Sequence, residues 1–184
     1  PVALIRESET ARSFTHRTFQ EMILGSADLE SYLLRYDEPL LDSSVRKKVL
    51  AWLEHPEHGG AVMTNRPSRG MPDADYGLQL VGLEGMPLAG YGEMEEMAAI
   101  FGGEAAFYSK PAPTHALAAA LGAVGVPNHL HLAQALANGS APESLADLDD
   151  TDFWVFEDTP AGLVSVEERG RVLRKSGLAV RVHI

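Results

Sequence analysis

The sequence predicts an α/β fold: one three-layer domain, residues 1–184, built around a mostly parallel sheet. Short apolar runs that end in small or polar residues alternate with segments whose apolar residues recur at helical spacing. Strands that alternate with helices are usually joined by right-handed crossovers and therefore pair in parallel. The chain has 184 residues, 45% of them hydrophobic, which is enough for a single core.

The strands are predicted from short apolar runs. The run from Phe153 to Phe156 contains aromatic and β-branched residues without alternation, which is typical of a parallel strand covered on both faces. Val2–Ile5 is a strand or the start of a helix. Beyond these, strands are expected at Ala61–Met63, Ala105–Tyr108 and Leu178–Ile184, and all are expected to lie in one sheet.

Helical spacing defines the segments between these strands. Asp42 is a candidate N-cap for a helix whose residues Val45, Val49, Trp52 and Leu53 form one stripe that is expected to be buried. Trp154 is likewise expected in the core. Two short helices are predicted within residues 15–34, and longer ones at Glu93–Ile100, Thr114–Leu121, Val126–Ala137 and Ala161–Lys175. The segment Ser68–Gly92 is predicted to be irregular.

Charge and composition exclude several classes of partner. The net charge of -11 and the pI near 5.0 argue against binding to nucleic acid or to an anionic membrane. The absence of cysteine excludes a disulfide framework. No apolar stretch has the length of a membrane span, and the first residues do not form a signal peptide. We therefore expect a soluble, cytoplasmic protein.

Polar residues follow three of the predicted strands. Thr64 and Asn65 follow the first, Lys110 follows the second, and Glu157 and Asp158 follow the third. Ligands of open α/β sheets bind at the carboxyl ends of the strands. Two carboxylates there could hold Mg²⁺ against a phosphate, whereas the alternative is that Asp158 only caps the helix that begins near Pro160.

This arrangement resembles the haloacid dehalogenase superfamily, and within it the phosphatase and phosphoglucomutase-like branch. The resemblance covers roughly residues 43–184 and is carried mainly by residues 110–113 and 156–162. It implies a Rossmann-like domain in which Thr64 and Asn65 bind the phosphoryl group, Lys110 steadies it, and Glu157 and Asp158 hold Mg²⁺. It also implies a short helical cap within residues 6–42 and a small phosphorylated metabolite as the substrate.

The residue types suit phosphoryl transfer on physical grounds. This reaction spreads negative charge over the equatorial oxygens of the phosphoryl group, so that catalysis depends mainly on positioned donors and cations. The Lys110 ammonium offers three donors and the Thr64 hydroxyl offers one. Carboxylate oxygens are the ligands that Mg²⁺ prefers.

One motif of the family does not follow an apolar run near the start of this chain. The family's first strand ends in Asp-x-Asp, whose first aspartate is the nucleophile and whose second is the general acid and base. Either these residues precede Pro1, or Val2–Ile5 is that strand and its catalytic positions have degenerated to residues 6–9. The sequence therefore predicts a Mg²⁺-dependent phosphatase that forms an aspartyl-phosphate, and the alternative is a non-catalytic protein of the same fold. The acids at 147, 149, 150 and 152 are interpreted as a solvated loop.

Overall fold

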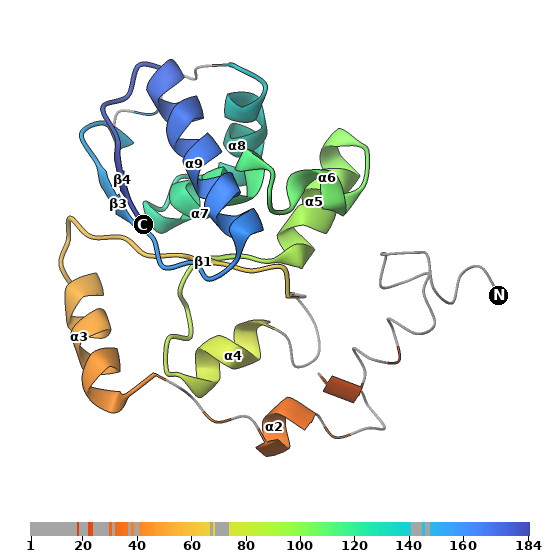
Figure 1. Ribbon diagram of the computed structural model, residues 1–184, viewed down its shortest axis with the longest axis vertical. Coiled ribbons are helices and arrows are strands. Elements are labelled where there is room, and N and C mark those ends of the chain that lie inside the picture. Colours follow the sequence, from red (N-terminus) through yellow and green to blue (C-terminus); the bar gives the residue numbers. More distant parts are fainter. Residues whose placement is uncertain are drawn as a thin grey trace.

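The chain has a mixed α/β architecture with parallel strands, as predicted (Figure 1). The computed structural model describes residues 18, 22, 23, 30, 32–36, 38, 41–66, 68, 74–140, 145 and 148–184. The helices are α2 (Tyr32–Tyr36), α3 (Ser43–Leu53), α4 (Ala74–Leu80), α5 (Tyr91–Phe101), α6 (Ala105–Tyr108), α7 (Pro113–Ala123), α8 (His129–Ala137) and α9 (Pro160–Lys175). The strands are β1 (Val62–Met63), β2 (Leu88–Ala89), β3 (Asp152–Trp154) and β4 (Arg181–His183).

The strands form two sheets. Within the residues listed above, β1 pairs only with β2, and β3 pairs only with β4, each in parallel. Val62 lies opposite Leu88, and Phe153 lies opposite Val182. The predicted parallel orientation is confirmed, but the single sheet that was expected to join all strands is not found in the described part of the chain.

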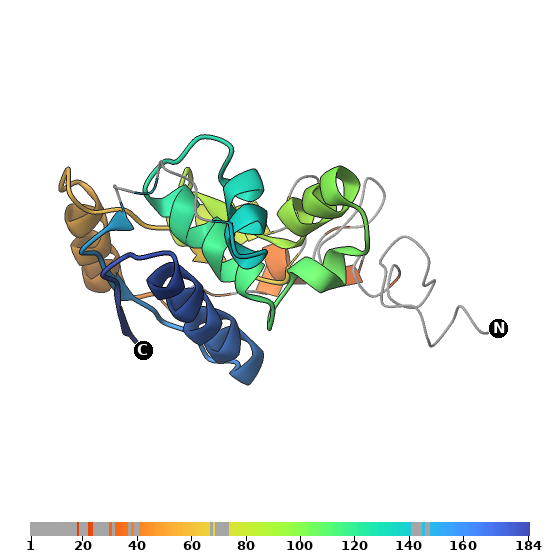
Figure 2. The ribbon, with the colours of Figure 1, turned by 90° about the horizontal axis from the view of Figure 1, so that it is seen from above.

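Helix α7 lies at the centre of the core. It packs against α8 and α9 and also contacts both β1 and β2 (Figure 2). Leu117 and Leu121 of α7 are fully buried, and the alanines beside them let the neighbouring helices approach closely. Because α9 in turn contacts β4, α7 and α9 connect the two sheets through one shared core.

The predicted strand at Ala105–Tyr108 is wrong, because this run forms α6. Ala105 and Tyr108 are buried whereas Phe107 is 67% exposed, a pattern with the i, i+3 spacing of a helix. The Tyr108 hydroxyl donates to the carbonyl oxygen of Gly102 at 2.6 Å. Periodicity alone does not distinguish a strand from a helix in an apolar run of four residues.

The prediction of irregular structure for Ser68–Gly92 is also wrong in part. This segment contains α4 and β2, and β2 is the strand that pairs with β1. The Val62 N–H donates to Pro87 O at 2.8 Å, and the Thr64 N–H donates to Ala89 O at 3.0 Å. A two-residue strand is too short to show a period, so only its pairing reveals it.

Strand β3 is covered on one face only. Phe153 faces α9, where the buried guanidinium of Arg169 lies 4.3 Å from the centre of its ring. Trp154 is 66% exposed and stacks on His183. The prediction of a strand buried on both faces, with Trp154 in the core, is therefore wrong.

The N-cap of α3 is confirmed, but its buried stripe is not. Asp42 Oδ1 accepts a hydrogen bond from the Ser44 N–H at 2.7 Å. Of the predicted stripe, Val45 and Trp52 are 44% and 46% exposed, and no residue of α3 is buried. Trp52 instead stacks on His58.

Two of the acidic residues at the start of β3, Asp150 and Asp152, bind β4 rather than forming only a solvated loop. The Asp152 carboxylate accepts two hydrogen bonds of 2.8 Å from Arg181 and one of 2.7 Å from His183. The hydrogen bonds from Arg181, followed by the one from His183, lower the pKa of Asp152 below its usual range. Asp150 also pairs with Arg181, at 2.8 Å.

Most predictions for the first 40 residues lie outside the described part. This holds for the predicted Val2–Ile5 strand and for most of the predicted cap, residues 6–42. Within the cap, helical structure is described at Thr18, Met22 and Ile23 and in α2. The other predicted helices correspond to α5, α7, α8 and α9. In the described part of the chain, no helix has the length and apolar character needed to cross a bilayer.

Candidate functional site

A buried ion pair joins two of the predicted site residues. Lys110 Nζ lies 2.6 Å from Glu157 Oε2, and the two side chains are only 9% and 5% exposed. Lys110 comes from the turn between α6 and α7, and Glu157 from the segment between β3 and α9. Two positions 47 residues apart thus meet as a charge-assisted hydrogen bond shielded from water.

Glu157 is also bound to the start of α9. Its Oε1 accepts from the Thr159 N–H at 3.0 Å and from the Thr159 hydroxyl at 2.5 Å. Burial alone would raise the pKa of Glu157, but the hydrogen bonds from Lys110 and Thr159 outweigh burial and lower it. Glu157 is therefore held as a carboxylate with both oxygens engaged.

Thr159, not Asp158, caps α9. Thr159 Oγ1 accepts from the Gly162 N–H at 3.1 Å, which satisfies one free donor of the first turn. The alternative in which Asp158 serves as the cap is wrong. Asp158 is exposed, and it lines an open hollow of about 490 Å³ together with Val155, Phe156, Glu157 and Ile184.

Gly162 leaves the space that Glu157 occupies. A Cβ atom built on Gly162 would lie 2.0 Å from Glu157 Cδ and 2.2 Å from Oε2, so any side chain here would displace the carboxylate.

We therefore expect Gly162→Ala to destabilise the protein by about 1–3 kcal/mol, as overpacking in cores typically does. This loss outweighs the gain of up to ~1 kcal/mol that alanine gives within a helix. Urea unfolding would measure the change. The control is Ala161→Gly, which replaces the neighbouring residue of the same turn and tests helix propensity alone. A stabilised Gly162→Ala variant would contradict the close contact.

His115 links the lysine turn to strand β2. Its ring is fully buried in the first turn of α7, where Nδ1 lies 3.1 Å from the Lys110 amide nitrogen and Nε2 lies 2.8 Å from Ala89 O. A carbonyl oxygen only accepts, so Nε2 carries the proton and Nδ1 accepts from the Lys110 N–H. Burial lowers the pKa of His115 to about 4, which keeps the ring neutral.

The lysine turn has further supports. The Ser165 hydroxyl of α9 donates to Ala112 O at 2.6 Å, and the Ala112 N–H donates to Ser109 O at 2.9 Å. The Ser109 hydroxyl donates to Ala105 O at 2.9 Å. The backbone on both sides of Lys110 is therefore held by α6 and α9.

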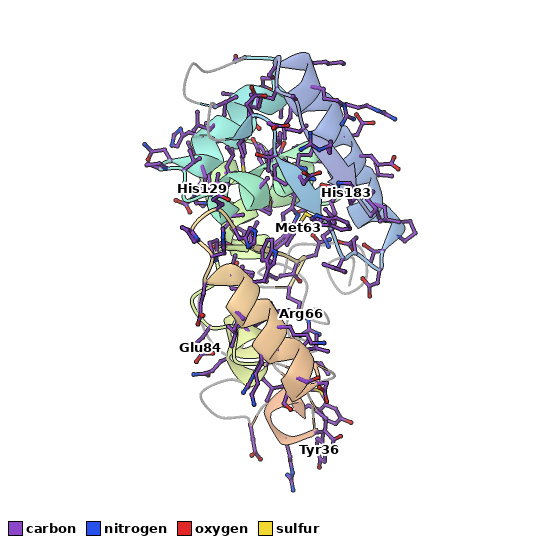
Figure 3. All side chains as sticks on the ribbon, turned by 90° about the vertical axis from the view of Figure 1, so that its left-hand side faces the viewer. Tyr36, Met63, Arg66, Glu84, His129 and His183 are labelled. Atoms are coloured by element: carbon purple, nitrogen blue, oxygen red, sulfur yellow. The ribbon has the colours of Figure 1, made fainter. Side chains whose placement is uncertain are left out.

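Thr64 enters the same hydrogen-bond network through Ala89. The carbonyl oxygen of Ala89 accepts from the Thr64 N–H at 3.0 Å as well as from His115. Thr64 Oγ1 accepts from the Arg66 N–H at 3.1 Å, which leaves the hydroxyl proton available to donate. Asn65 is exposed beside it. Figure 3 labels Met63, the last residue of β1, and Arg66, whose N–H donates to Thr64 Oγ1.

The segment after Thr64 is anchored to α5 by a buried carboxylate. Glu93 Oε2 accepts from the Ser68 hydroxyl at 2.5 Å and from the Gly90 N–H at 2.7 Å. The Gly92 N–H donates to Ser68 Oγ at 2.9 Å. Both polar turns of the site are thus fixed by buried hydrogen bonds.

The structure connects some of the predicted residues and leaves others apart. Lys110 and Glu157 are in direct contact, and Thr64 is linked to Lys110 through Ala89 and His115. No hydrogen bond in the described part joins the side chains of Thr64 or Asp158 to Lys110. Sequence reasoning missed His115 and Thr159. The available signals were a histidine in the first turn of the helix after Lys110 and a threonine directly before a Pro-initiated helix.

Comparisons with protein-family models, with curated proteins and with solved structures find no match to this chain.

Proposed function

We propose that this chain carries the phosphate-binding residues of a phosphohydrolase of the haloacid dehalogenase type, which cleaves a small phosphorylated metabolite with the help of Mg²⁺. The buried pair of Lys110 and Glu157 is the observation that carries the proposal. A buried ion pair is weak evidence for stability, because apolar residues would often serve as well there. The position of Glu157 beyond the carboxyl end of β3 favours a functional role for the pair.

The donors of the site suit a phosphoryl group. Lys110 Nζ uses one of its three N–H groups on Glu157 and retains two for an anion. The Thr64 hydroxyl, at the end of β1, is the second donor. In this proposal Lys110 and Thr64 bind the oxygens of the phosphoryl group, Asn65 contacts the remainder of the substrate, and Glu157 holds the lysine in place.

The nucleophile is proposed to come from a further strand between β1 and β3. In the described part, β1 and β3 each have one edge without a strand partner, and both run parallel to their existing partners. One parallel strand paired with both edges would convert the two sheets into the single sheet of a three-layer, Rossmann-like domain. Its carboxyl end would then carry Asp-x-Asp beside Thr64 and Glu157.

The residues present could supply only part of a Mg²⁺ site. Asp158 is an exposed carboxylate of the hard-oxygen type that Mg²⁺ prefers, whereas both oxygens of Glu157 are engaged. Among the described residues, no group of three potential ligands is close enough to hold a metal. Asp158 would therefore act with the aspartates of the further strand, and a bound Mg²⁺ would neutralise charge on the phosphoryl oxygens.

Activity assays test this proposal. Without a nucleophile, the 184-residue chain should give no measurable turnover of p-nitrophenyl phosphate or sugar phosphates in the presence of Mg²⁺. A longer form that carries Asp-x-Asp ahead of Pro1 should gain Mg²⁺-dependent turnover, and replacing its first aspartate by asparagine should reduce that rate by about 10³-fold or more.

Two aspartate variants provide the matched comparison. In the longer form, Asp158→Asn should lose most of the Mg²⁺-dependent activity, whereas Asp150→Asn, which lies in the Arg181 cluster, should retain it. A longer form with Asp-x-Asp that folds but shows no turnover would favour the alternative, a non-catalytic protein of the same fold.

A further inference from the structure

His115 is the one side chain in the described part that bonds both to the turn of Lys110 and to β2, the strand that pairs with the segment of Thr64. Its Nδ1 accepts from the backbone of Lys110, and its Nε2–H donates to the Ala89 oxygen that also accepts from the Thr64 N–H. The ring is fully buried, and each of its two nitrogens makes one hydrogen bond to a backbone group. It therefore fixes the distance between the turn of Lys110 and strand β2, which belong to different parts of the chain.

A buried polar ring is costly unless both nitrogens are satisfied. An apolar residue would fill the same space without that requirement, and leucine and alanine occupy most of the other buried positions of α7. Space filling alone therefore does not explain histidine. The two hydrogen bonds do, because an apolar residue makes neither of them.

We propose that His115 is a positioning residue that holds the Lys110 ammonium and the Thr64 hydroxyl in one relative geometry through its neutral, Nε2-protonated ring. The inference rests on the proposed function only in assigning the phosphoryl group to Lys110 and Thr64. The ring is not itself a catalytic residue, since its nitrogens are committed to backbone groups.

Three substitutions separate the two hydrogen bonds. In His115→Asn the amide oxygen can occupy the position of Nδ1 and keep the bond from the Lys110 N–H, but the side chain is too short to reach Ala89. In His115→Gln the amide nitrogen can reach Ala89 O, and the acceptor for the Lys110 N–H is lost. His115→Phe keeps the ring shape and loses both bonds.

Two readouts report on Lys110 without any phosphate or metal. Hydrogen exchange of the Lys110 amide should accelerate about tenfold in His115→Gln and His115→Phe, the effect of losing one hydrogen bond, and much less in His115→Asn. Acetylation of Lys110, read by mass spectrometry against the exposed Lys47, Lys48 and Lys175, should rise in the same order. Equal acceleration in all three variants, or none in His115→Phe, would overturn the proposal.

A measurement on the unmodified chain covers the case in which the variants do not fold. The nitrogen chemical shifts of His115 at neutral pH should identify a ring that carries its proton on Nε2. A proton on Nδ1 instead would mean that the Lys110 N–H has no acceptor there, which would overturn the proposal. These tests need no turnover, so their failure is distinguishable from failure of the proposed phosphatase activity.

Discussion

Glu157→Gln is expected to lower the free energy of unfolding by about 3–5 kcal/mol, because it leaves the Lys110 ammonium buried without a counter-charge. The two side chains are 9% and 5% exposed, so water replaces the lost carboxylate only in part. Glutamine keeps the shape and can still accept from Thr159. The loss would therefore report on the charge pair and not on packing. Urea unfolding with an unchanged m-value would measure it.

A double-mutant cycle separates the interaction between Lys110 and Glu157 from their other contacts. In Lys110→Met no buried cation remains, so adding Glu157→Gln to this variant should lower the free energy of unfolding by about 1 kcal/mol or less. The effect of Glu157→Gln in the unmodified chain minus its effect in Lys110→Met is the coupling energy of the pair. The matched control is the exposed pair of Arg171 and Glu168 on α9, whose side chains are 59% and 39% exposed. Glu168→Gln should change stability by about 0.5 kcal/mol at most. Equal effects for Glu157→Gln and Glu168→Gln would show that the buried geometry is wrong.

Acidification is expected to destabilise the protein through His115. The pKa of this histidine is about 4 in the folded chain and 6.5 in the unfolded chain, so only the unfolded state takes up the proton between these values. The free energy of unfolding should therefore fall as the pH decreases from 7, by about 2 kcal/mol at pH 5 and about 3 kcal/mol at pH 4. Chemical unfolding at several pH values would measure this slope.

His115→Gln provides the control for the acid prediction. The variant has no group that titrates at this position, so its stability should change less between pH 7 and pH 5 than that of the unmodified chain. The lowered pKa of Glu157 adds a further loss of stability at lower pH, near and below the usual glutamate value of 4.5, and a comparison above pH 5 avoids this contribution. Parallel stability curves for the two proteins would contradict the buried, neutral state of His115.

The long periodic segments of the fold could be predicted because their evidence is local. In the stretch that forms α9, apolar residues recur at helical spacing over several turns. A proline marks the start of this stretch and a lysine its end, and the observed helix has the same bounds. Ala105–Tyr108 has too few residues to show a period, and its helical state depends on the burial of Tyr108. Strand β2 was missed for the same reason, since its two residues become a strand only when β1 lies beside them.

The sequence by itself determined the α/β class with parallel strands, the position of most helices and the presence of Lys110 and Glu157 after apolar runs. These features follow from residue order, because periodicity and caps act over a few neighbours. Only the tertiary structure decided that Glu157 pairs with Lys110 and that His115 joins the turn of Lys110 to strand β2. Those contacts span up to 47 residues, and they arise because packing of α7 against α9 and β2 brings distant polar groups together where they are largely shielded from water.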